Sequence, residues 1–213
     1  MPKTSWFIII IALIALVGFF IFYAKQIQPS INSNLNVLEN VTYEPLANYV
    51  STTTDFGLVV ENKNVGLKFT VPIDWKARKI TNSFLDNQNI QQGSILITSP
   101  DAQVDDLTNV AKKGCGFSLR VEKRESENKF KTIANLIEIT KNNTTSSVYS
   151  LVDAAGRPAL METVFEDQNF GKAVIVSLPI ENTIYIFETI FLNAEKDRCQ
   201  VAFTDFLKNV EIK

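Results

Sequence analysis

The residues of this chain that could do chemistry are its carboxylates and two cysteines, because the sequence contains no histidine. Without histidine, a serine or cysteine nucleophile lacks its usual base, and most zinc sites lack a ligand. A pair of carboxylates could still hydrolyse a glycosidic bond if the two groups lay about 5–10 Å apart in an open cleft. Glu162, Glu166 and Glu188 fall on predicted strands and are the candidates for such a pair. Sequence gives no distance between them, so an extracellular hydrolase ranks last among our three hypotheses.

A second acidic group consists of Asp101, Asp105 and Asp106. Calcium binding is one interpretation, but the segment lacks the Asx-rich loop with a central glycine and a closing glutamate. The other interpretation is structural, because acids in the first turns of a predicted helix that starts at Ser99-Pro100 interact favourably with the helix dipole. We therefore predict no catalytic, metal-binding or cofactor-binding residue.

The two cysteines both fall on apolar faces of predicted elements. Cys115 begins an alternating strand over 115–124, and Cys199 shares a helical stripe with Phe203, Phe206 and Val210. Outside the cytoplasm, two such cysteines most often form a disulfide. The alternative is two separate buried thiols that behave as small apolar side chains. We predict the Cys115–Cys199 disulfide, on the condition that the domain lies outside the cytoplasm.

The opposite face of the strand over 115–124 carries charges of both signs. Arg120, Glu122 and Arg124 alternate there and form a candidate binding face. Alternating charges on an exposed strand also serve solubility and edge protection, which is the plainer interpretation.

The elements that must position these residues follow an apolar N-terminal stretch. Trp6–Tyr23 contains no charge and no proline, and 18 residues of helix span about 27 Å, close to the hydrocarbon thickness of a bilayer. A cleaved signal peptide is the alternative, but the best cut site, after Ala24, has phenylalanine at a poor position. Lys3 precedes the stretch and Lys25 follows it, with the amino terminus adding a charge on the first side. We predict a signal-anchor transmembrane helix within residues 1–24, an N-terminus in the cytoplasm and an extracytoplasmic domain.

The rest of the chain divides by composition. Residues 25–55 are rich in asparagine, serine and threonine, which predicts a polar tether, and residues 56–213 form the predicted domain. The chain carries 21 basic and 23 acidic residues, a balance that argues against nucleic acid as a partner.

Apolar periodicity predicts an α+β domain with an antiparallel sheet flanked by helices. Strand patterns cover 56–60, 65–71, 76–81, 94–98, 115–124, 148–152, 158–166, 172–178 and 183–192. Helical signals cover the stretch between Ser99 and Gly114, residues 129–140, and the segment that starts near Asn193.

One run of residues resembles a known family. Gly66, Phe69, Pro72 and Trp75 stand in the spacing G-x-x-F-x-x-P-x-x-W, which resembles the opening of PsbP-like domains (the PsbP/Mog-type fold). The Gly156-Arg157-Pro158-Ala159 turn and the closing segment 203–212 resemble the same family. The resemblance implies an α/β/α sandwich in which the four motif residues are structural. This chain has no histidine, so the histidine-containing metal sites of photosynthetic members cannot be carried over. Nothing in the sequence implies photosynthesis, and a membrane-anchored bacterial protein is the closer match.

The resemblance also orders the functional hypotheses, because PsbP-like domains are mostly non-enzymatic docking or assembly factors. Our first hypothesis is a single-pass membrane protein whose extracytoplasmic domain binds a protein partner or assists assembly of an envelope complex. The second is a carrier that holds a small molecule or lipid in a cleft. An enclosed apolar pocket would favour the carrier, and an exposed apolar patch would favour docking.

Overall fold

A computed structural model describes residues 41–82, 92–106, 109–124, 132–137, 148–167 and 171–213. Residues 41–213 form one compact unit. The described part contains no helix long and apolar enough to cross a membrane. The predicted span at 6–23 and the first part of the predicted tether lie outside the described residues.

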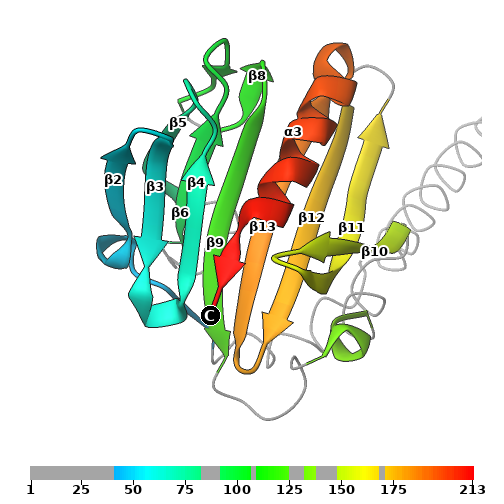
Figure 1. The fold of residues 1–213 in the computed structure, drawn as a ribbon. Coiled ribbons are helices and arrows are strands. Elements are labelled where there is room, and N and C mark those ends of the chain that lie inside the picture. The colour runs from blue at the N-terminus through cyan, green and yellow to red at the C-terminus, as the bar shows by residue number, and fades with distance from the viewer. Residues whose placement is uncertain (1–40, 83–91, 107–108, 125–131, 138–147, 168–170) are drawn as a thin grey trace, which may run out of the picture. The chain divides into compact units, whose positions relative to one another are not determined.

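Antiparallel strands dominate this unit, and Figure 1 shows their arrangement. The first half contains β1 (Val41–Tyr43), β2 (Val50–Thr54), β3 (Gly57–Asn62), β4 (Leu67–Val71), β5 (Lys76–Asn82), β6 (Gln92–Thr98), β7 (Gln103–Val104) and β8 (Ala111–Lys113). The second half contains β9 (Gly116–Arg124), β10 (Val148–Ala154), β11 (Arg157–Asp167), β12 (Gly171–Ile180), β13 (Thr183–Leu192), α3 (Lys196–Asn209) and β14 (Glu211–Ile212). Short 3-10 turns cover Leu46–Asn48 (η2), Lys63–Val65 (η3) and Asn193–Glu195 (η4).

The described strands form a large sheet and a small sheet that face each other. The large sheet runs β10-β11-β12-β13-β9-β6-β5, with β1 also paired to β9. The small sheet runs β14-β4-β3-β2, and β7 pairs only with β8. The small sheet and α3 lie side by side over one face of the large sheet (Figure 1). All these strand pairs are antiparallel, which confirms the predicted sheet type.

The main core lies between the large sheet and the layer formed by α3 and the small sheet. Phe206 of α3 is at its centre, with its ring centroid 5.4 Å from that of Phe69 and 6.0 Å from that of Phe117. The opposite face of the large sheet carries a smaller cluster, in which Leu136 packs with Leu160, Ile184 and Ile186. Residues 133–137 are helical, so within the part of the chain that the structure describes, helices flank the sheet less fully than a complete α/β/α sandwich requires.

Two sequence predictions need correction. Residues 41–55, assigned to the tether, supply β1 and β2, which pair with β9 and β3, so the compact unit begins at Val41 rather than near Phe56. The predicted helix between Ser99 and Gly114 is absent, and the described residues there form the β7–β8 hairpin. Ser99 Oγ accepts a hydrogen bond from the Cys115 amide at 2.9 Å, so it caps no helix.

The four residues of the family motif have structural positions. Gly66 has φ +63°, and a Cβ there would lie 2.5 Å from the Lys213 carbonyl oxygen. Phe69 is buried in the main core. The Pro72 carbonyl accepts a hydrogen bond from the Trp75 amide at 3.0 Å, and the Trp75 ring lies 5.3 Å from that of Phe117.

Candidate functional site

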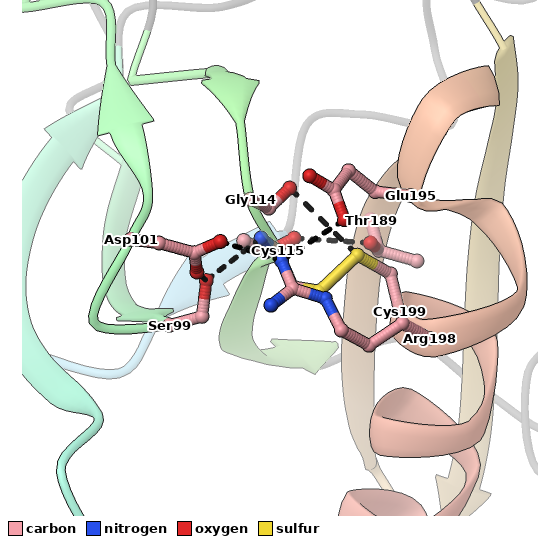
Figure 2. The surroundings of a disulfide bond; sticks show 9 residues. Ser99, Asp101, Gly114, Cys115, Thr189, Glu195, Arg198 and Cys199 are labelled. Atoms are coloured by element: carbon pink, nitrogen blue, oxygen red, sulfur yellow. Dashed lines mark hydrogen bonds and ion pairs between the residues drawn. A yellow bond between two sulfur atoms is a disulfide. The ribbon is translucent and has the colours of Figure 1, made fainter.

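The predicted disulfide between Cys115 and Cys199 is present and ties the residue directly before β9 to α3. Figure 2 shows a polar cluster beside it. Ser99 Oγ donates to Asp101 Oδ1 at 2.7 Å, and Arg198 Nη2 donates to Asp101 Oδ2 at 2.8 Å. These two hydrogen bonds lower the pKa of Asp101 to about 2. Asp101 therefore holds the β6–β7 connection against α3, which is a structural role.

The candidate binding face on β9 is not an exposed surface. β9 lies inside the large sheet, between β13 on one side and β6 and β1 on the other. The side chains of Arg120 and Glu122 are only 14% and 6% exposed. Arg120 Nε lies 3.2 Å from Glu122 Oε1, and Arg120 Nη1 contacts Glu188. Arg124 pairs with Val41 through its backbone.

The charges on this face compensate one another. Burial disfavours the charged form of Arg120, but attraction to the Glu188 and Glu122 carboxylates outweighs it and raises the pKa of Arg120. Ser118 Oγ also donates to Glu188 at 3.2 Å. One guanidinium thus contacts both carboxylates, which is the arrangement of a structural ion-pair cluster.

The three acids considered for hydrolysis lie on β11 and β13. Glu162 and Glu188 lie in one row of the large sheet with Ile175 between them, so their backbones are about 10 Å apart by strand spacing. Glu188 is held by Arg120. Glu166 Oε1 accepts from Lys196 Nζ at 2.8 Å. None of the three acids lines the cavity described below.

A buried polar cluster joins the β1 end of the chain to the small sheet. The Glu44 carboxylate is buried, accepts from Asn48 Nδ2 at 2.8 Å and Asn62 Nδ2 at 3.2 Å, and lies 2.7 Å from Lys123 Nζ. Burial disfavours its charge, but the hydrogen bonds from Lys123, Asn48 and Asn62 outweigh burial and lower the pKa of Glu44. The ionised carboxylate thus fixes residues 41–49 to the compact unit.

This cluster sets a pH dependence of stability. Because the pKa of Glu44 is lower in the folded chain than its usual value of 4.5, the stabilisation is complete above that value and is lost as the pH falls through the folded-state pKa. We expect Glu44→Gln to cost about 1–3 kcal/mol at pH 7, because hydrogen bonds to an ionised group are lost. The variant should lose less stability than the unaltered chain between neutral and acidic pH. Urea unfolding across that range checks this, and equal losses in both chains would contradict it.

A cavity of about 650 Å³ lies where η3 meets the β12–β13 turn. Asn62 and Tyr185 contribute to its wall, and the Tyr185 hydroxyl donates to the Val65 carbonyl. Its charged lining is mixed in sign and consists of Glu61, Lys63, Lys68, Arg157, Glu181 and Lys213. A carrier for an apolar molecule needs an enclosed apolar pocket, and this cavity is largely polar.

The small sheet ends in an exposed apolar tip formed by Phe56 and Ile73. Phe56 lies in the β2–β3 turn and is 81% exposed, and Ile73 follows β4 and is 69% exposed. Leu58 pairs with Val71. The residues just before Leu58 and just after Val71 therefore lie at the same end of the small sheet. A Cβ at Gly57 would lie 2.9 Å from the Val71 carbonyl oxygen, which shows how closely the two segments approach.

Sequence reasoning missed this apolar tip. The strand pattern over 56–60 includes Phe56 but does not show that this side chain is exposed, and Ile73 has no predicted role. The signal that was available is the position of both apolar side chains beside turn residues, Asp55 and Asp74. Asp74 has φ +67°, so the chain turns sharply directly after Ile73.

No protein-family model and no curated protein matches this sequence. Among solved structures, the chain is similar to the solution structure of cyanobacterial PsbP from Synechocystis sp. PCC 6803. The similarity covers 79% of this chain and 95% of the cyanobacterial chain, with 9% sequence identity and a TM-score of 0.42. At these values the comparison transfers no functional residue.

Proposed function

We propose that this chain is a non-catalytic, membrane-anchored protein with a PsbP-like extracytoplasmic domain that docks a protein partner during assembly of an envelope complex. The observation that carries the proposal is the apolar tip of Phe56 and Ile73. Two large apolar side chains at one end of a sheet lose contact with water when a partner covers them, which favours association.

The disulfide supports the proposed location. Structural disulfides form and persist in oxidising compartments and are rare where thiols are kept reduced. Both cysteines of the chain take part in the Cys115–Cys199 bond. The uncharged stretch Trp6–Tyr23 supplies the proposed anchor, with the domain on the outer side of the membrane.

Photo-crosslinking of the full chain in intact cells tests the docking role. We expect a photoreactive phenylalanine at position 56 to give one dominant protein adduct, because a docked partner covers that side chain. The same group at Thr204, which is exposed on α3, serves as the matched control and should give no such adduct. Adding Ile73→Asp should remove the adduct from position 56 without unfolding the chain.

Absence of a position-specific adduct at position 56 would contradict the proposal. So would an adduct that persists with Ile73→Asp, because the crosslinked partner would then not depend on the apolar tip. Thermal unfolding of the Ile73→Asp chain confirms that a lost adduct reflects lost contact, since an exposed side chain contributes about 0.5 kcal/mol or less to stability.

A further inference from the structure

The strand β2 is the outer edge of the small sheet, and the side chains of all its residues are exposed. Its sequence, Val50-Ser51-Thr52-Thr53-Thr54, contains no charge and no proline, and its pairing with β3 continues without a bulge. Soluble proteins normally protect an open edge with charges, prolines, bulges or a covering element. β2 carries none of the first three and is not covered by any described element (Figure 1).

Three other edge strands of the described sheets differ from β2. β5 carries Lys76, Arg78 and Lys79, which guard the far edge of the large sheet. β14 is only two residues long. β10 ends in Asp153 and Ala154 and begins directly after residues that the structure does not describe. Among these edges, β2 is thus the one whose whole length is shown to be uncharged and exposed.

We infer that β2 pairs antiparallel with β2 of a second copy of this chain, about a two-fold axis at Thr52. Such a pair places threonine against threonine at the centre and serine against threonine on each side, which are favourable cross-strand neighbours. No like charges meet, because the strand is uncharged. Alternate residues of β2 turn their backbone N–H and C=O groups away from β3, and a second β2 would satisfy them.

The positions of two exposed apolar residues fit this partner. Val50, 61% exposed, stands at the start of β2, and Phe56 stands two residues beyond its end. Antiparallel pairing places Val50 of each copy opposite Thr54 of the other, and therefore next to the turn that carries the other copy's Phe56. At each end of the paired strands, Val50 of one copy would thus lie beside Phe56 of the other. One strand pairing would cover both side chains.

This inference rests on the proposed function and names the partner of the same region. Five residues a side bury less surface than the roughly 800 Å² per partner of a standard interface, so the pairing alone is weak. Anchoring both copies in one membrane raises their effective concentration and favours the pair. The experiment therefore uses the full chain in its membrane.

Cysteine crosslinking tests the pairing directly. Both native cysteines are in the disulfide, so Thr52→Cys adds the one free thiol of the chain. On the proposed two-fold axis, the two copies' residues at this position face each other within the separation of about 7 Å that a disulfide tolerates. We expect about tenfold or more disulfide-linked dimer after mild oxidation than with Lys79→Cys on the guarded edge β5. Adding Thr53→Lys to Thr52→Cys should reduce the dimer to the Lys79→Cys level, because lysine protects an edge.

The outcomes separate this inference from the proposed function. Dimer formation by Thr52→Cys no greater than by Lys79→Cys overturns the inference, and a position-56 photo-adduct to a different protein would then leave the docking role standing. A dimer that survives Thr53→Lys also overturns it, since the contact would not be strand pairing. A Thr52→Cys dimer together with a position-56 adduct of twice the chain's mass supports the inference, and it supports the docking role as well if Ile73→Asp removes that adduct.

Discussion

The double replacement Cys115→Ala/Cys199→Ala should lower the free energy of unfolding by about 4.5 kcal/mol, because the bond closes a loop between residues 84 apart in sequence. In the chain-entropy model, the cost arises in the unfolded state, which gains freedom once the loop is open. Since small domains are stable by only about 5–15 kcal/mol in total, this loss is a large part of the stability. Urea unfolding of the oxidised chain and of the double variant measures the difference.

The matched control is Arg198→Ala, which removes the hydrogen bonds to Asp101 and Glu195 beside the disulfide but keeps the covalent link. These ion pairs are exposed, so the control should cost about 1 kcal/mol or less. A double variant no less stable than the Arg198→Ala control would show that α3 holds to β9 by packing alone.

The strands of this domain were predictable because most of them bury one face. In β9, Phe117, Leu119 and Val121 alternate with polar residues and continue the pattern of Cys115 just before the strand, and the alternation follows directly from the pleat of a strand against a core. The same reasoning found α3, where Cys199, Phe203 and Phe206 recur at helical spacing on its buried side.

Prediction failed where a strand has no core face. β2 is exposed along its whole length, so Ser51 and its three threonines carry no apolar alternation and resemble a tether. The small contact between β1 and β9 likewise depends on the buried Glu44 cluster, which involves residues far apart in sequence.

The helix predicted after Ser99 failed for a different reason. A small polar residue, a proline and a closing glycine also suit a hairpin that begins and ends with sharp turns. Ser99 Oγ accepts from the Cys115 amide across the hairpin, and Asn109 and Gly114 both have positive φ. The deciding interaction joins residues 16 apart, which a local pattern cannot reveal.

The apolar tip could not be predicted because it depends on register. Phe56 and Ile73 are far apart in sequence, and only the pairing of Leu58 with Val71 brings their two segments to one end of the small sheet. Their exposure is also a tertiary property, because the same residue type at Phe69 is buried two positions before β4 ends. Composition shows that the chain has 15 phenylalanines but not which of them face water.

The second large expected effect is on stability and concerns the buried Phe206. Phe206→Ala should lower the free energy of unfolding by about 3–5 kcal/mol, the usual cost of removing a buried aromatic ring. The Phe206 ring contacts Phe69 of the small sheet and also Phe117 and Phe187 of the large sheet. Its loss therefore removes contacts that join α3 to both sheets. Thermal and urea unfolding of the oxidised chain measure the change.

Phe56→Ala is the matched control, since it removes the same atoms from an exposed position. It should change stability by about 0.5 kcal/mol or less, because the ring has little contact to lose. If Phe56→Ala cost as much as Phe206→Ala, the Phe56 ring would belong to the folded core, and the docking proposal would lose the observation that carries it. If the two variants separate as expected, the Phe56 ring contributes little to folding, and it stays free to serve as part of the proposed docking surface.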